Sequence, residues 1–234
     1  MVPAGRISGM SRIRLVVFDI AGTIIEDHGE VARAFTKALM ENGIPFVEDE
    51  LKRWKGASKR EVIRNFVKQA DSKGDIDQTV ENSYRRFRSE LEGFYSEKLE
   101  PIGGAVDTFR WCKDHNILLA TTTGFYREIS DLILRQTGWC DFFAANISSS
   151  DVPQGRPAPY MIFRAMEATG VQNVKEVVNV GDTPLDLQSG SNAGLTGVVG
   201  VLTGAHDRES LQGQPHTHII NSIADLPDLI ARAF

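Results

Sequence analysis

The chain has few cysteines, no long apolar stretch and no surplus of positive charge, and each shortage excludes a class of protein. Its two cysteines, Cys112 and Cys140, are too few for a disulfide framework and lack metal-binding spacing, so we expect buried, reduced thiols. No apolar run approaches the ~20 residues that a membrane-spanning helix needs. A net charge of −5 gives no basic surface for nucleic acid. Together these shortages predict a cytoplasmic protein with no membrane or nucleic-acid partner.

Strand-like and helical segments alternate through most of the chain, which predicts an α/β fold with a parallel sheet. Strand patterns occur at residues 15–18, 117–121, 142–147, 177–180, 197–201 and 218–220. Between residues 27 and 97 apolar residues recur at helical spacing, and no strand pattern interrupts them. We therefore predict a doubly wound, Rossmann-like core of residues 10–26 and 98–234, an inserted all-helical cap of residues 27–97, and a flexible leader of residues 1–9.

Asp19 ends the first predicted strand. Residues 15–18 form a continuous apolar run, which is typical of a strand buried on both faces of a parallel sheet. Ligands bind at the carboxyl ends of strands in such sheets, and Asp19 stands at that end, before the turn Gly22-Thr23. Asp19 is therefore a candidate nucleophile; the alternative is an acid that only caps the turn.

Three later strand ends also carry polar side chains. Thr123 and Gly124 precede a predicted helix, where a hydroxyl and amides can hold an anionic oxygen. Arg156 stands in a proline-rich loop, either as a phosphate ligand or as a solvated charge. Asp182 and Asp186 follow the strand at 177–180, where Gly181 leaves room for a ligand; they can share one Mg²⁺ or merely cap the next helix.

A carboxylate, a hydroxyl, a cation and a carboxylate pair, in that order, resemble the haloacid dehalogenase superfamily over the chain from about residue 12. The resemblance implies that Asp19 forms an aspartyl phosphate. It further implies that the phosphoryl group is bound by Ala21, Gly22, Thr123, Gly124 and Arg156. The implied ligands of Mg²⁺ are Asp19, the backbone carbonyl of Ala21, Asp182 and Asp186.

Ala21 occupies the position at which most phosphatases of this superfamily carry a second Asp, which protonates the leaving alkoxide. A methyl group cannot donate a proton, and losing a general acid costs about 10²- to 10⁴-fold in rate. The chain resembles the phosphonatase (phosphonoacetaldehyde hydrolase) branch, which shares the Asp-x-Ala-Gly-Thr motif. The similarity extends to residues 122–128, 151–157 and 180–194. It implies cleavage of a carbon–phosphorus bond.

Lys59 matches the cap lysine with which phosphonatases form a Schiff base to the substrate aldehyde. The Ser58 to Glu61 spacing predicts a capping box, which places Lys59 in the first turn of a helix. There the helix dipole and burial both disfavour the ammonium. Two alternatives stay open: a solvated lysine, or a cation that binds a distal phosphate, because residues 55–59 are similar to the cap segment of β-phosphoglucomutase.

Three positions depart from the phosphonatase pattern, since Lys55 replaces a Met, Val62 a His and Phe125 a Tyr. We expect a Mg²⁺-dependent hydrolase that cleaves a small carbonyl-containing phosphonate such as phosphonoacetaldehyde. The alternatives are a phosphomonoesterase or β-phosphoglucomutase-like enzyme acting on a small phosphorylated metabolite, and a non-catalytic module that binds a phosphorylated ligand. The resemblance also implies a homodimer.

Overall fold

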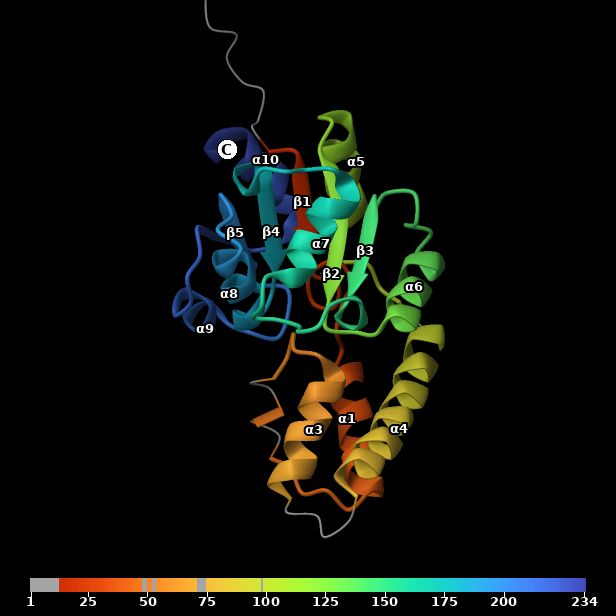
Figure 1. Ribbon diagram of the computed structural model, residues 1–234. Helices are drawn as coiled ribbons and strands as arrows, with labels where there is room; N and C mark the ends of the chain where they lie inside the picture. Colours follow the sequence, from red (N-terminus) through yellow and green to blue (C-terminus); the bar gives the residue numbers. More distant parts are fainter. Residues whose placement is uncertain (1–12, 48–49, 52–53, 71–74, 98) are drawn as a thin grey trace, which may run out of the picture.

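The computed structural model describes residues 13–47, 50–51, 54–70, 75–97 and 99–234, so the predicted leader of residues 1–9 lies outside the described residues. Its centre is a six-stranded parallel sheet in the order β3-β2-β1-β4-β5-β6 (Figure 1). The strands are β1 Leu15–Phe18, β2 Leu118–Thr123, β3 Ala145–Ser148, β4 Val177–Gly181, β5 Gly197–Val201 and β6 His218–Ile220. The predicted α/β class and parallel sheet are confirmed.

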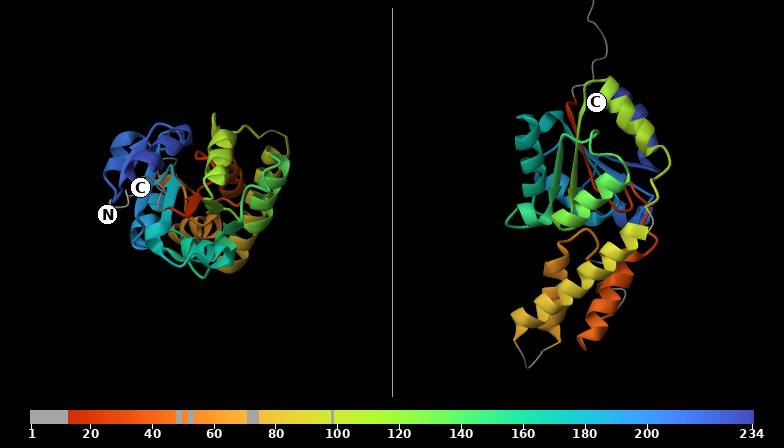
Figure 2. Two further views of the ribbon diagram at one scale, coloured as in Figure 1. Left: turned by 90° about the horizontal axis from the view of Figure 1, so that it is seen from above. Right: turned by 90° about the vertical axis from the view of Figure 1, so that its right-hand side faces the viewer.

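Helices cover both faces of this sheet, because alternate residues of the apolar strand β1 point to opposite sides. Leu15 and Val17 belong to one buried cluster, and Val16 and Phe18 belong to the other. The helices of the core are α5 Ala105–Asp114, α6 Arg127–Gln136, α7 Tyr160–Thr169, α8 Pro184–Asn192, α9 Arg208–Gln212 and α10 Leu226–Ala233. Figure 2 shows the resulting layers from two further directions. The sheet is therefore doubly wound, as predicted.

Three helices, α1 Glu30–Glu41, α3 Lys59–Gln69 and α4 Ile76–Glu97, lie together beyond the carboxyl ends of the strands (Figure 1). Each buries an apolar face against the others; Phe35 of α1, for example, meets Phe87 of α4 at 4.5 Å between ring centroids. The arrangement agrees with an inserted helical cap, and its bounds at residues 27 and 97 stay predictions. Within the described part of the chain, no helix is long and apolar enough to span a membrane.

Two chain crossings join this helical group to the core and run beside each other. Glu26 N donates to Glu100 O at 2.8 Å, and Ile102 N donates to Ile24 O at 3.0 Å. The side chains of His28 and Glu100 add a 2.8 Å contact between Nε2 and Oε2. The paired crossings form a short two-stranded hinge.

The structure corrects two expectations in the core. Strand β3 begins at Ala145 rather than at Phe142, because Phe142 and Phe143 turn toward Phe109 in an aromatic cluster, with ring centroids 5.5 and 5.1 Å from it. Of the cysteines, both free, only Cys112 is buried; Cys140 is exposed because Trp139 beside it takes the core position.

Candidate active site

The polar residues that end the strands meet at one edge of the sheet. Strands β2, β1 and β4 are neighbours in exact register, so Phe18 pairs with Thr121 and with Val180. This register brings Asp19, Thr123 and Asp182 to the same edge. The gathered side chains are all nearly inaccessible to solvent: Asp19 6%, Lys59 6%, Thr123 2%, Arg156 4%, Asp182 2% and Asp186 1% exposed. A cluster of ionisable groups at this degree of burial marks a functional site.

Three carboxylates, those of Asp19, Asp182 and Asp186, present oxygens that lie within 4.8 Å of one another. Asp182 Oδ2 accepts a hydrogen bond from Ala205 N at 3.0 Å. Asp186 Oδ2 accepts from Thr183 N and Oγ1, at 3.1 and 2.6 Å. Asp186 Oδ1 is buried and accepts no hydrogen bond. Asp182 Oδ1 in addition accepts from Thr23 Oγ1 at 3.4 Å, so protein groups orient both carboxylates, a common arrangement around bound metals.

Asp186 also caps α8, so the capping interpretation is correct for this residue. Thr183 is the N-cap, and its side chain and that of Asp186 form a reciprocal capping box. The cap uses only Oδ2 of Asp186 and leaves Oδ1 for a second role. The predicted ligand space beside Gly181 is wrong, because the carboxyl group of Asp186 fills it and would collide with any side chain at that position.

The negative charges of the buried carboxylates of Asp182 and Asp186 are only partly offset by nearby protein groups. Burial raises the pKa of Asp182 well above its usual range, and the negative charges of Asp19 and Asp186 raise it further. Burial likewise raises the pKa of Asp186 to about 6, although Arg156 opposes the rise. A hard divalent cation matches this set of carboxylate oxygens and offsets their repulsion. The donor set therefore fits a divalent metal.

Arg156 connects the loop after β3 to the nucleophile candidate. Its Nη1 donates to Asp19 Oδ1 at 2.7 Å, and its Nη2 donates to the carbonyl and the hydroxyl oxygen of Thr122 at 2.7 and 3.0 Å. Nη1 also lies 2.7 Å from Asp186 Oδ1 without forming a hydrogen bond to it. Burial alone would lower the pKa of this guanidinium, but Asp186 and Asp19 outweigh it and raise the pKa. Arg156 is thus a fixed, charged group and not a solvated one.

The predicted phosphoryl contacts lie around the same point. Ala21, Thr123 and Gly124 line a small cavity beside Asp19. Thr123 Oγ1 accepts from Phe125 N at 3.1 Å. Gly22 has φ 85° and makes the turn after β1: its N–H donates to Ile25 O at 2.7 Å, and its carbonyl accepts from Thr203 Oγ1 at 2.7 Å. The phosphoryl roles of these residues stay predictions.

Lys59 is the first residue of α3, as predicted, and it is buried over the same cavity. Its Nζ donates to Ala57 O at 3.1 Å and lies 5.3 Å from the centroid of the Phe125 ring. Burial lowers the pKa of Lys59 to about 8; Asp19 opposes the shift and Arg156 adds to it. The alternative of a solvated lysine is therefore wrong. A neutral amine is accessible to this side chain near physiological pH.

The predicted capping box at Ser58 is wrong. Ser58 is the N-cap of α3, but its side chain makes no capping hydrogen bond, and Glu61 is exposed. Ser58 packs against the core instead: a side chain at Gly155 would meet Ser58 Cβ at 3.5 Å. The contact of Ser58 with the loop at Gly155 stands where a capping hydrogen bond within α3 was predicted.

Glycines let the loop before α3 approach two core loops closely. A side chain at Gly56 would meet Thr183 Oγ1 at 2.6 Å, and one at Gly124 would meet Gly56 O at 2.6 Å. Gly56 itself has φ 85°, a left-handed conformation that favours glycine. The loop holds Lys59 above Asp19 by direct contact between the cap and the core.

Two groups that support the site were not predicted from the sequence. Asp27 lines the small cavity and accepts from Lys55 Nζ at 3.0 Å, which ties the hinge to the loop before α3. The loop after β5 holds Asp182 through Ala205 N, and Gly204 leaves space for that carboxylate. Strand β5 also ends at this edge of the sheet, so this loop could have been predicted in the same way as the other residues.

A family model for haloacid dehalogenase-like hydrolases matches residues 16–200, and the chain belongs to this family. Within it the chain is similar to phosphonoacetaldehyde hydrolases, as predicted. The enzyme of Latilactobacillus sakei subsp. sakei is 31% identical over 230 residues, covering 93% of this chain and 83% of the relative. One from Bacteroides fragilis (strain YCH46) is 28% identical over 237 residues, covering 93% and 88%.

The fold agrees with solved structures of the family. A phosphonoacetaldehyde hydrolase-like protein from Oleispira antarctica superposes with a TM-score of 0.81 at 20% identity, covering 100% of this chain and 99% of that chain. The family-model match makes the chain a hydrolase of this family, and the interpretation as a non-catalytic binding module loses its support.

Proposed function

We propose that the protein is a Mg²⁺-dependent phosphonatase-like hydrolase that cleaves the carbon–phosphorus bond of a small carbonyl-containing phosphonate. The observation that carries the proposal is that Lys59 and Asp19 line one small cavity together with Ala21. A carboxylate nucleophile, an amine and an alanine at the position of the usual second acid suit a leaving carbon better than a leaving alkoxide.

Asp19 supplies the nucleophile. Arg156 holds Asp19 Oδ1 at 2.7 Å, which fixes the orientation of the carboxylate toward the incoming phosphorus. The carboxyl oxygen displaces the carbon, so an acyl phosphate forms on Asp19, and water then hydrolyses it. Mg²⁺, held by Asp19, Asp182, Asp186 and the Ala21 carbonyl, would lower the charge repulsion between the carboxylate and the phosphoryl group.

Lys59 activates the leaving carbon. The neutral amine condenses with the substrate carbonyl and, with the uptake of one proton, gives an iminium ion and water. When the carbon–phosphorus bond breaks, its electron pair enters the iminium as an enamine, so no carbanion forms. Protonation at carbon and hydrolysis return the amine. Burial of Lys59 supports this role, because it supplies an uncharged amine.

The second candidate is a phosphomonoesterase or mutase on a small phosphorylated metabolite. One observation favours it: Lys55 and Lys59 both line the cavity, and two cations there suit a distal phosphate. Against it, Lys55 is already paired with Asp27 at 3.0 Å, and Ala21 offers no acid for a leaving alkoxide.

Trapping with borohydride separates the two candidates. In the presence of phosphonoacetaldehyde, borohydride should inactivate the enzyme and add a stable mass to the peptide that contains Lys59. The matched variant Lys59→Arg keeps the positive charge, forms no Schiff base, and should lose both the label and phosphonate turnover by more than about 10³-fold. Full turnover by Lys59→Arg would remove the phosphonatase proposal and leave the distal-phosphate role.

A further inference from the structure

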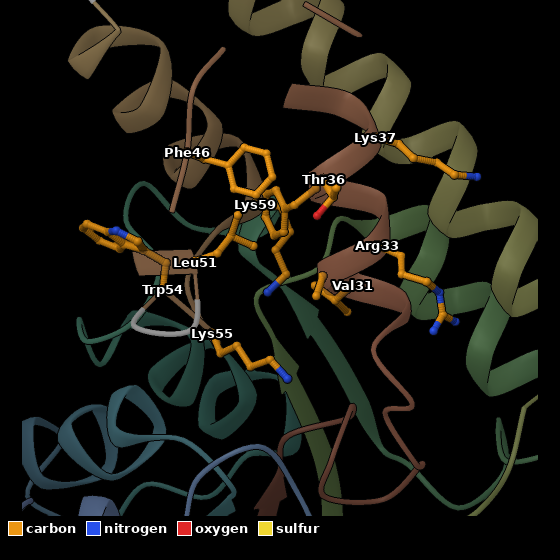
Figure 3. Close-up of a pocket in the computed structure, with 11 residues that line it drawn as sticks. Val31, Arg33, Thr36, Lys37, Phe46, Leu51, Trp54, Lys55 and Lys59 are labelled. Carbon is orange, nitrogen blue, oxygen red and sulfur yellow. The ribbon is translucent and has the colours of Figure 1, made fainter. Parts of the chain in front are cut away.

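A second, larger cavity opens inside the cap next to Lys59. Its volume is about 420 Å³, and its walls come from α1 and from the segments that precede α3 (Figure 3). The apolar lining residues are Val31, Ala32, Phe35, Phe46, Leu51 and Trp54. We call this space the cap cavity.

Among the described residues, four cations line the cap cavity, and all but Lys59 are paired with an acid; Lys55 pairs with Asp27. Arg33 pairs with Glu30 at 2.9 Å, and Lys37 pairs with Glu90 at 2.6 Å. Figure 3 shows the charged ends of Arg33 and Lys37 pointing away from the aromatic residues. The wall therefore suits a hydrocarbon group better than an anion.

The cap cavity adjoins the catalytic one. Val31, Lys55 and Lys59 line both, so the Lys59 side chain stands at their junction. The catalytic cavity beside Asp19 has a volume of only about 30 Å³, room for a few water molecules. Because that space is small, a further substituent on the carbonyl carbon finds room in the adjoining cap cavity.

We infer that the substrate is a 2-oxoalkylphosphonate, in which an apolar alkyl group on the carbonyl carbon occupies the cap cavity. The inference rests on the proposed function, because it assumes that Lys59 attacks the carbonyl at the junction. Phosphonoacetaldehyde has only a hydrogen at that position and would leave the 420 Å³ space unfilled.

The reaction balances with water as the only co-reactant. Lys59 and the ketone take up one proton, form an iminium ion and release water, and Asp19 takes the phosphoryl group as the electron pair of the carbon–phosphorus bond enters an enamine; hydrolysis of the iminium later returns that proton. Protonation at the former phosphonate carbon and hydrolysis of the iminium and the acyl phosphate consume two waters. The net products are a methyl ketone and inorganic phosphate.

A chain-length series tests the inference with the complete protein and Mg²⁺. Phosphate release is measured with 2-oxopropyl-, 2-oxobutyl- and 2-oxohexylphosphonate, ketones of equal electrophilicity, and with phosphonoacetaldehyde. We expect kcat/KM to rise about fourfold for each added methylene group, because each one leaves water for an apolar wall. A flat or falling series beside measurable phosphonoacetaldehyde turnover would overturn the inference and leave the proposed function standing.

A substitution that fills the cap cavity gives a second test of the inference. Thr36 lies on α1 at the cap cavity and is half-buried. Thr36→Phe should bring the hexyl-to-propyl ratio of kcat/KM to about one, whereas Thr36→Val, which has the same shape without the hydroxyl, should keep the ratio at or above the wild-type value. The ratio cancels any general loss of activity, and circular dichroism checks folding. An unchanged ratio in a folded Thr36→Phe contradicts the inference; no phosphate from any phosphonate would refute both the inference and the proposed function.

Discussion

The pH dependence of turnover should report the buried amine of Lys59. Burial lowers its pKa to about 8, and only the neutral amine can attack a carbonyl. Below pH 8 the neutral fraction falls tenfold per pH unit, so kcat/KM for phosphonoacetaldehyde should rise with a slope of about one up to pH 8 and then level off. A profile that is flat between pH 6 and 8 would contradict a nucleophilic role for Lys59.

The same burial makes Lys59 costly for stability. Its pKa is lower in the folded chain than its ordinary value of 10.5, so the unfolded chain binds the proton more tightly. The cost is therefore fully present below about pH 8 and fades as pH rises toward 10.5. Lys59→Met should raise the free energy of unfolding by about 1–3 kcal/mol at pH 7, and by less at pH 10.

Urea unfolding of Lys59→Met at the two pH values measures this effect. The control is Lys68→Met, an exposed lysine in the same helix, which should change stability by less than about 0.5 kcal/mol. Equal effects of the two substitutions would mean that burial of the Lys59 ammonium carries no cost.

At the scale of elements, the contact between the loop before α3 and the loop after β2 should control catalysis. Gly124 has no left-handed φ, so its backbone accepts alanine, but the new methyl group would collide with the carbonyl of Ala57. Gly124→Ala should therefore displace Lys59 from Asp19 and lower kcat/KM by about 10²-fold, the cost of an error of about 1 Å.

Steady-state kinetics and a thermal melt check this prediction. Gly93→Ala on α4 is the control, because no atom lies within 4 Å of the added methyl group. It should leave kcat/KM unchanged and stabilise the helix by about 0.5–1 kcal/mol. Wild-type activity in Gly124→Ala would mean that this contact does not position Lys59.

Elements with a strong local pattern could be predicted from the sequence, and elements set by tertiary contact could not. The apolar run at 15–18 was predicted to the residue, and Lys59 lies in the first turn of a helix as predicted. The start of β3 was misplaced, because Phe142 and Phe143 are good strand residues that pack into a cluster around Phe109. The capping box failed for the same reason, since Ser58 meets Gly155 of the core.

At the scale of the whole molecule, the parallel topology explains why the site was largely predictable. Carboxyl ends of neighbouring parallel strands share one edge, so the residues after β1, β2 and β4 had to meet. No comparable sequence pattern predicted the cap cavity. It depends on how α1 faces residues 44–47 and 54–55, and that placement follows from packing of the three cap helices and not from a motif.

Mg²⁺ should stabilise the whole protein, because three buried carboxylates gather within 4.8 Å. A ligand that binds only the folded state at 100 times its Kd adds about 2.7 kcal/mol, which for a chain of this size is about 5–10 °C in Tm. Protons compete for the same oxygens, and the pKa of Asp186 is raised to about 6, so the Mg²⁺-induced rise in Tm should grow from pH 5 to pH 7. Thermal melts with Mg²⁺ and with EDTA measure this rise in Tm.

Asp182→Asn is the control variant. It keeps an acceptor for Ala205 N but removes the charge, and it should abolish the rise in Tm together with phosphate release. An equal rise in Asp182→Asn would place the cation elsewhere, and full activity in EDTA would show that the carboxylates act without it.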